Sequence, residues 1–155
     1  MGKNKHPHSA FDRGDRKAPR SAFGDPGEKR ARGEAPNVLR RAPLWAFRIV
    51  DLGGPWCWSA LSGSDLAQVL QRLKQLESMT WAEIEGGEHH FVDVAGCSKP
   101  ARDRLQALKH DDTPSLFSLR ITGRHRIYGI RNEHVLGFLW WDPEHEVYPS
   151  QKKHT

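Results

Sequence analysis

The sequence predicts an α+β fold: one domain, residues 43–155, preceded by a basic tail, residues 1–42. Composition separates the two parts, because all six tryptophans and both tyrosines lie after residue 42. Hydrophobic residues alternate in four segments and recur every third or fourth residue in two others, which are the spacings of strands and helices. The segments follow one another as strand, helix, helix and three strands. We therefore expect an antiparallel meander with the helices packed on one face of the sheet.

The segment 44–51 is the first predicted strand. Its large hydrophobic residues alternate along the chain, so that they share one face of an extended segment. These residues are Trp45, Phe47 and Ile49. A cluster of glycine and proline at residues 53–55 is expected to end the strand.

Two helices are expected next. Ser62 or Ser64 caps the first one, and the hydrophobic residues that follow have the spacing of a single helix face. They are Leu66, Val69, Leu70, Leu73 and Leu76. Ser98 caps the second helix, after a short apolar piece at residues 91–94. Between the two helices, Thr80 and Glu83 have the spacing of a capping box, which predicts one further turn of helix.

Three strands are expected in the last third of the domain. They are residues 116–121, 126–131 and 135–141. Turn-forming residues follow each of them, namely Gly123, the pair Asn132–Glu133 and the pair Asp142–Pro143. Such short connections favour hairpins between consecutive strands, and this is why we expect a meander.

The basic excess of the chain lies in its first 42 residues, which carry 11 Lys and Arg against 5 Asp and Glu. This segment also contains four prolines and five glycines. Low hydrophobicity with high charge is typical of disorder, because little apolar surface is available to offset the entropy of folding. We therefore expect a disordered tail. It would serve either as an electrostatic arm for RNA or the ribosome surface, or only as a solubilising segment.

Several classes of protein do not fit the sequence. No stretch approaches the ~20 consecutive apolar residues of a membrane helix, and the first residues lack the apolar run of a secretory signal. Cys57 and Cys97 form no CxxC pair, so they do not suggest a zinc site. Adjacent histidines, His89 and His90, point to opposite faces of a strand and rarely bind one metal together. We expect a cytoplasmic protein with no membrane partner, no metal and no other cofactor.

Basic and proton-transferring residues concentrate in the three predicted strands and just after them. Alternate residues share a face of a strand, so residues from neighbouring strands can meet at one edge of the sheet. Arginine binds phosphate through two hydrogen bonds, histidine or tyrosine can transfer a proton, and RNA supplies its own 2′-hydroxyl as nucleophile. This combination suits RNA cleavage without a metal. The candidate catalytic residues are Arg126, Arg120, His145 and Tyr148.

Other residues are expected to contact RNA away from the reacting phosphate. Positive side chains neutralise backbone phosphates, and an exposed tryptophan stacks on a base. The candidates are Arg131, Arg124, Lys152, Lys153 and Trp141. The alternative is that the arginines form only the solvated face of a half-buried sheet.

The strand block resembles a known family. The sequence from Arg120 to Tyr128, RITGRHRIY, is followed by a hairpin, a hydrophobic strand and a terminal Glu-Val-Tyr. This pattern resembles the RelE/ParE toxin superfamily, in particular the RelE and YoeB types, over residues 44–150. The resemblance implies the strand–helix–helix–three-strand fold. It also implies metal-independent cleavage of messenger RNA in the ribosomal A site, which many of these toxins perform.

The resemblance assigns a role to each candidate. Arg126 would contact the scissile phosphate, Arg120 would support it, and His145 or Tyr148 would transfer the proton. A cognate antitoxin protein is implied as a partner that covers the active face. The expected function is thus a toxin-like endoribonuclease that acts on mRNA at the ribosome. The alternative is a non-catalytic RNA-binding, ribosome-binding or protein-interaction module on the same scaffold, which the acidic Asp142 and Glu144 favour.

Overall fold

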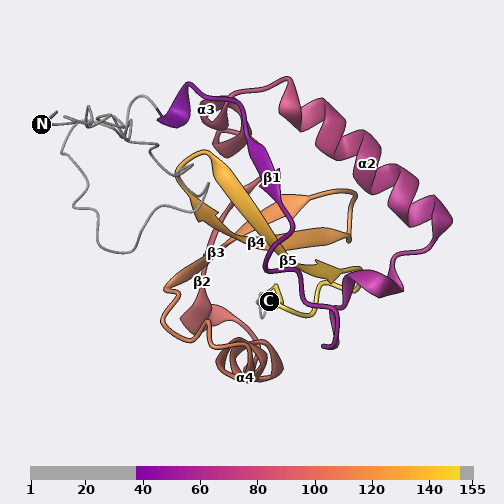
Figure 1. The fold of residues 1–155 in the computed structure, drawn as a ribbon, viewed down its shortest axis with the longest axis vertical. Helices are drawn as coiled ribbons and strands as arrows, with labels where there is room; N and C mark the ends of the chain where they lie inside the picture. Colours follow the sequence, from indigo (N-terminus) through magenta and orange to yellow (C-terminus); the bar gives the residue numbers. More distant parts are fainter. Residues whose placement is uncertain (1–37, 151–155) are drawn as a thin grey trace, which may run out of the picture.

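The computed structural model describes residues 38–150, which form an α+β fold around one mixed five-stranded sheet (Figure 1). The strand order is β1-β5-β4-β3-β2; β1 runs parallel to β5, and every other neighbouring pair is antiparallel. The bounds are Leu44–Ala46 for β1, His90–Asp93 for β2, Ser115–Arg120 for β3, Arg126–Asn132 for β4 and Val135–Asp142 for β5. The expected antiparallel meander is therefore only part of the sheet. β1 pairs in parallel with β5, which makes the sheet mixed, and β2 adds an edge strand beside β3.

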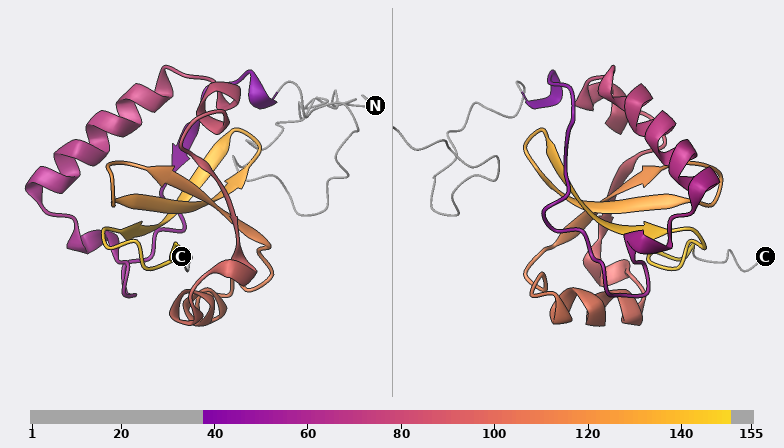
Figure 2. Two further views of the ribbon diagram at one scale, coloured as in Figure 1. Left: turned by 180° about the vertical axis from the view of Figure 1, so that it is seen from behind. Right: turned by 45° about the vertical axis from the view of Figure 1, so that its right-hand side comes forward.

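The helices cover both faces of the sheet, so the expectation of helices on one face is wrong. Helix α2 (Gly63–Glu77) and the short α3 (Trp81–Glu85) pack on one face, and α4 (Lys99–Ala107) packs on the other (Figure 2). Two separate hydrophobic clusters result, one with Trp81, Phe117 and Phe138 and one with Leu105 and Trp140. Both faces of β3, β4 and β5 are apolar, and a sheet with two apolar faces needs cover on both.

The predicted helix starts are confirmed, and two of the three caps are made by side chains. Ser62 stands at the N-cap position of α2 without a capping hydrogen bond from its side chain, whereas the Ser98 side chain accepts the amide of Ala101 at the start of α4. The Thr80 hydroxyl accepts the Glu83 amide, while the Glu83 carboxylate accepts the Thr80 amide at 2.8 Å. The reciprocal pair satisfies two amides that a helix start would otherwise leave unbonded. Local hydrogen bonding of this kind is readable without knowledge of the tertiary fold.

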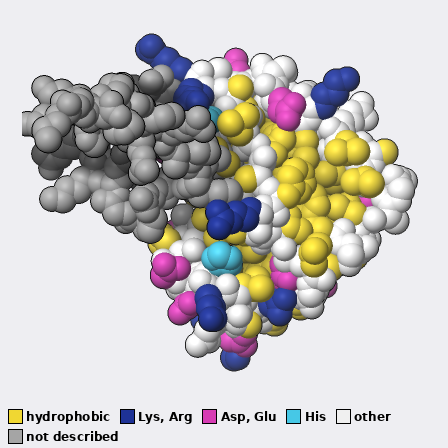
Figure 3. All heavy atoms as spheres, in the orientation of Figure 1, with side chains coloured by type: hydrophobic (Ala, Val, Ile, Leu, Met, Phe, Trp, Pro, Cys, Tyr) yellow, Lys and Arg dark blue, Asp and Glu magenta, His cyan; other side chains and the backbone are white. Residues whose placement is uncertain are grey.

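The first strand is shorter than expected. β1 ends at Ala46, and Phe47 is 58% exposed instead of buried. Similarly, Val69, Leu73 and Leu76 of α2 are buried, whereas Leu66 and Leu70 are largely exposed. Figure 3 shows the resulting apolar surface between α2 and the segment that contains β1. The hydrophobic spacing therefore predicts a wider buried face of α2 than the sheet covers.

The last three strands are consecutive antiparallel neighbours, as the sequence predicts. The pairing of β4 with β5 shifts by one residue, because Tyr128 faces Trp140 while Gly129 faces Phe138. Leu139 is thus the extra residue of a β-bulge, and its carbonyl oxygen accepts the amide of Asp51 instead. Beyond the bulge, Trp140 and Trp141 point to opposite faces and both are buried.

The predicted basic tail lies mostly outside the described residues. Its last residues, 38–42, are described and belong to the folded part, where the amide of Trp81 donates to the carbonyl of Arg41 at 3.0 Å. The predicted RNA-binding residues Lys152 and Lys153 also lie outside the described residues. Within residues 38–150 no helix has the length and apolar character required to cross a membrane.

Candidate functional site

A pocket of about 490 Å³ opens on the face of the sheet that α4 covers only in part. All four candidate catalytic residues line it: Arg120 from β3, Arg126 from β4, and His145 and Tyr148 from the segment after β5. Strand alternation explains the two arginines, because they are cross-strand partners and their side chains share a face. The pocket as a whole brings together residues as far apart in the sequence as Arg120 and Tyr148, which are 28 positions apart.

Arg126 is the more enclosed arginine of the pair. Its Nη1 atom donates to three carbonyl oxygens of the β3–β4 turn, those of Thr122 at 2.9 Å, Gly123 at 3.1 Å and His125 at 3.1 Å. Burial lowers the pKa of Arg126 below its usual value, and the neighbouring charge of Arg120 lowers it further. Two guanidinium groups side by side favour the binding of an anion between them.

Arg120 has an acidic partner inside the pocket. Its Nη1 atom donates to the Glu88 carboxylate at 2.9 Å, and Arg72 lies 3.9 Å from the other oxygen of the same carboxylate. Glu88 is 56% exposed, so water screens this ion pair and the carboxylate is free to move. An incoming phosphate would compete with Glu88 for Arg120.

The segment after β5 is held in place by Asp142. This carboxylate is fully buried and accepts two backbone amides, those of Glu146 at 3.0 Å and Val147 at 2.8 Å. The carbonyl of Val147 in turn accepts the amide of Ser98 at the start of α4 at 2.9 Å. Asp142 therefore orders the loop that carries His145 and Tyr148, and it is not among the residues that line the pocket.

His145 has a left-handed backbone conformation, with φ of 58°. Side chains with a Cβ atom adopt this region at a cost of about 1 kcal/mol, and asparagine tolerates it better than most. Such strain persists only where the surrounding structure enforces it, as the Asp142 hydrogen bonds do here. The strained turn brings the imidazole into the pocket.

Tyr148 packs directly against Gly96, which also lines the pocket. A Cβ atom at Gly96 would lie 2.8 Å from the tyrosine ring and 3.1 Å from its hydroxyl, so a larger residue here would force the ring of Tyr148 to move. Gly96 ends the 3-10 turn η2 (Val94–Gly96) that links β2 to α4. The close approach fixes the ring against this turn.

The pocket also contains residues that the sequence reasoning missed. His90 of β2, Ser118 of β3 and Tyr128 of β4 line it, and they are cross-strand partners in one row. Ser118 and Tyr128 each lie two residues from a candidate arginine, so strand alternation alone places them on the same face. His90 was not recognisable, because its position depends on β2 joining the edge of the sheet.

His89, which directly precedes β2, and His90, its first residue, point to opposite sides, as alternation predicts. His89 is 3% exposed, and its Nδ1 accepts the backbone amide of Arg120 at 3.0 Å. Burial lowers the pKa of His89 to about 4, and the charge of Arg72 adds to this shift. His89 is thus neutral near pH 7 and supports the position of β3 from behind the pocket.

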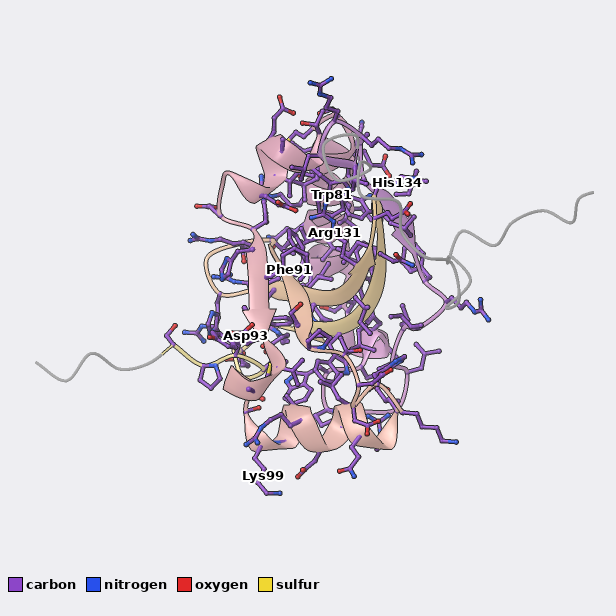
Figure 4. The ribbon with its side chains drawn as sticks, turned by 90° about the vertical axis from the view of Figure 1, so that its left-hand side faces the viewer. Trp81, Phe91, Asp93, Lys99, Arg131 and His134 are labelled. Atoms are coloured by element: carbon purple, nitrogen blue, oxygen red, sulfur yellow. The ribbon has the colours of Figure 1, made fainter. Side chains whose placement is uncertain are left out.

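Two of the predicted RNA-binding residues do not suit that role. Trp141 is 2% exposed in the core beside α2, so its ring is not available to stack on a base. Arg131 points to the face opposite the pocket, where its guanidinium lies 4.0 Å from the centre of the Trp81 ring and pairs with Glu85 (Figure 4). Burial lowers the pKa of Arg131 to about 10. Arg131 is five residues from Arg126 on the same strand, so regular alternation along β4 places the two side chains on opposite faces.

Arg124 remains exposed in the turn between β3 and β4. Its Nη1 donates to the Glu144 carboxylate at 3.0 Å, and neither residue lines the pocket. The two acidic residues that favoured a non-catalytic module are therefore accounted for by contacts outside the pocket. Asp142 bonds backbone amides, and Glu144 bonds Arg124.

The described residues include no group of three or more His, Cys, Asp or Glu side chains placed to hold a metal ion. Comparisons with protein-family models, with curated proteins and with solved structures gave no match to this chain. Two cations bind an anion, and an imidazole and a phenol beside them can exchange protons with it.

Replacing His145 by asparagine separates the backbone strain of this residue from its chemistry. Asparagine removes the imidazole but suits the left-handed conformation, so we expect the melting temperature to stay the same or rise slightly. If the imidazole transfers a proton, RNA cleavage falls by about 10²–10⁴-fold while RNA affinity is unchanged. Tyr148→Phe is the companion variant, because it removes only the hydroxyl. Unchanged cleavage in both variants would exclude both residues from proton transfer.

Proposed function

We propose that this protein is a metal-independent endoribonuclease of the toxin type that cleaves mRNA, with the ribosome as its platform. The observation that carries the proposal is the convergence of Arg120, Arg126, His145 and Tyr148 on one pocket. These residues come from two strands and a loop, and they are the residues to which the resemblance to RelE and YoeB toxins assigns phosphate binding and proton transfer. A merely solvated basic face would not require a histidine and a tyrosine from a distant segment at the same place.

The proposed reaction uses the 2′-hydroxyl of the RNA as nucleophile. Its oxygen attacks the adjacent phosphorus and loses its proton to a base in the pocket, while the bond to the 5′-oxygen breaks and that oxygen receives a proton. The products are a 2′,3′-cyclic phosphate and a free 5′-hydroxyl. Arg126 and Arg120 would stabilise the charge that develops on the phosphate oxygens. His145 or Tyr148 would transfer the proton.

The test is to induce the full chain in a bacterial host and to map RNA ends with and without the protein. We expect new 5′-hydroxyl ends within messenger RNA, and in purified reactions we expect cleavage to continue in EDTA. Loss of cleavage in EDTA with recovery on addition of zinc or magnesium would contradict the mechanism. Protection of RNA without new ends would favour the binding module instead.

A non-catalytic RNA-binding module stays the second candidate because of one observation. The Glu88 carboxylate lies in the pocket and bonds Arg120, so the second cation is partly neutralised before any RNA arrives. A site of this kind can still bind phosphate, but it would stabilise a developing charge less well than two free arginines. The two candidates differ in what the removal of this carboxylate should do.

Replacing Glu88 by glutamine is therefore informative. The change removes a negative charge beside Arg120 and keeps the shape of the side chain, so we expect RNA affinity to rise by about threefold to fivefold at low salt. Glu77→Gln is the matched control, because Glu77 is an exposed acid at the end of α2. Filter binding at several salt concentrations measures both. A large loss of cleavage in Glu88→Gln would show instead that this carboxylate takes part in the reaction.

The basic segment before the described residues is proposed as an electrostatic arm. Residues 1–37 carry nine of the 24 Lys and Arg residues. Deleting them should reduce the affinity for RNA or ribosomes and the steepness of its salt dependence, since fewer counterions are released. The melting temperature of the remaining domain should change little. Equal salt dependence with and without the segment would assign it no role in binding.

A protein partner is also part of the proposal. Toxins of the superfamily that this chain resembles pair with antitoxins. Phe47, Leu66 and Leu70 are exposed hydrophobic residues on the side of the sheet that carries α2, where Figure 3 shows an apolar surface. This side is opposite the pocket, so a partner bound there would not cover the pocket itself. Contiguous exposed apolar surface commonly marks a protein interface. Co-expression with the protein encoded by the neighbouring reading frame is the experiment that identifies such a partner.

A further inference from the structure

The pocket contains a second row of polar side chains beside the arginines. His90, Ser118 and Tyr128 lie opposite one another on three adjacent strands, one step along the sheet from Arg120 and Arg126. Ser118 is 3% exposed and Tyr128 is 1% exposed, so both hydroxyls belong to the floor of the pocket. The next row along the strands, with Val92 and Leu116, is apolar and belongs to the cluster under α4.

We propose that this row binds the nucleoside attached to the scissile phosphate, and that the pocket therefore takes a nucleoside 3′-phosphate unit of RNA. The proposal rests on the proposed function for the identity of the polymer. Side chains two residues apart on a strand are about 6.6 Å apart, which is comparable to the span from a phosphate to its own sugar and base. A phosphate held between Arg120 and Arg126 would place its nucleoside over Ser118 and Tyr128.

The two hydroxyls can act as a fixed hydrogen-bonding pair. Tyr128 and Ser118 are cross-strand partners that line the pocket, and each hydroxyl has one proton to donate and lone pairs to accept, so the pair can both donate to a ligand and accept from it. Burial raises the pKa of Tyr128 well above its usual value, so the phenol stays protonated and remains a donor. A base or ribose offers both donors and acceptors, whereas a bare phosphate would reach only the arginines.

The walls of the pocket suit a nucleoside as well. The Tyr148 ring and the Val92 side chain add apolar surface to the lining, and His90 adds a planar ring on β2, the edge strand of the sheet. Planar rings and apolar contacts hold bases by stacking, which is tolerant of sequence. Ser118 and Tyr128 would add the directional contacts that orient the sugar or base.

The experiment measures the binding of small probes to the full chain by calorimetry. The probes are the four nucleoside 3′-monophosphates and inorganic phosphate. We expect at least one nucleotide to bind about tenfold or more tightly than inorganic phosphate. Tyr128→Phe and Ser118→Ala should each reduce the nucleotide affinity by about threefold to tenfold, the effect of losing one hydrogen bond, and leave the phosphate affinity unchanged.

Ser115→Ala is the matched control. Ser115 is on the same strand as Ser118 but three residues away, so alternation turns its side chain to the other face, and it lies outside the pocket. Melting curves check that each variant is folded. If Tyr128→Phe does not fold, Ser118→Ala alone still tests the proposal. Equal affinities of the wild type for nucleotides and phosphate, or an unchanged nucleotide affinity in Ser118→Ala, would overturn the proposal. Nucleotide preference without RNA cleavage would refute only the proposed function, and cleavage without nucleotide preference would refute only this inference.

Discussion

Replacing Arg126 by alanine is expected to reduce RNA cleavage by about 10²–10³-fold, the usual effect of removing one group that stabilises charge at a reacting centre. Arg126 is the pocket arginine that the β3–β4 turn holds most firmly, through three carbonyl oxygens. The same hydrogen bonds mean that alanine also loosens the turn. We expect this to lower the melting temperature by only a few degrees, since the turn is on the surface.

Two further variants separate charge from geometry. Arg126→Lys keeps the positive charge but cannot bind a phosphate through two parallel hydrogen bonds, so cleavage should stay low while RNA affinity recovers. Arg124→Ala is the control, because Arg124 is two residues away, equally charged and outside the pocket. It should leave cleavage within about threefold of the wild type. Similar mild losses in all three variants would indicate a diffuse basic surface and support the binding module.

Asp51→Ala is expected to have the largest effect on stability. Asp51 is 3% exposed and is bonded by Nε and Nη2 of Arg104 at 2.8 and 2.7 Å, by Nε1 of Trp140 at 3.0 Å, and by the amides of Gly53 and Gly54. This network ties α4 and the loop after β1 to β5. Its loss should cost about 3 kcal/mol of unfolding free energy, or roughly 10 °C in melting temperature, because several buried groups lose their partner at once.

The same residue predicts a pH dependence of stability. The hydrogen bonds from Arg104 hold the pKa of Asp51 well below its usual value of about 3.9. A carboxylate with a lowered folded-state pKa contributes stability above about pH 4 and loses it as the pH falls further. Urea unfolding at pH 2, 3, 4 and 7 should therefore show a shallower decrease for Asp51→Asn than for the wild type. Parallel curves would mean that Asp51 does not dominate the acid response.

Much of the fold could be predicted from sequence because its signals are local. The Thr80–Glu83 capping box, the Ser98 cap and the alternation in β3, β4 and β5 depend only on near neighbours. The pairing of β1 with β5 and of β2 with β3 joins segments about 90 and 25 residues apart, and hydrophobic spacing does not encode such partners. The placement of helices on two faces does have a local signal, the nearly continuous apolar run of β5, which is typical of a strand covered on both faces.

In the candidate site, too, residues with local signals could be predicted and residues that depend on distant contacts could not. Arg120 and Arg126 were predictable because both lie on regular strands joined by a short turn, where alternation fixes the face. Arg131 was misassigned although alternation along β4 places it on the face opposite Arg126, and Trp141 was misassigned because helices cover both faces of the sheet, so neither Trp140 nor Trp141 is exposed. The roles of Asp142 and Glu144 were unreadable, since an acidic residue near a site looks the same in sequence whether it faces the pocket or bonds backbone amides.

One measurement tests the central claim directly. A messenger RNA is prepared with a single 2′-deoxynucleotide at a position that the protein cleaves, bound to ribosomes, and incubated with the full chain in EDTA beside the unmodified RNA. Because the 2′-hydroxyl is the proposed nucleophile, we expect cleavage at that position to disappear while the RNA stays bound and neighbouring positions are still cut. Cleavage at the deoxynucleotide, or a requirement for a divalent metal at the unmodified one, would contradict the assignment of this pocket as a metal-independent ribonuclease site.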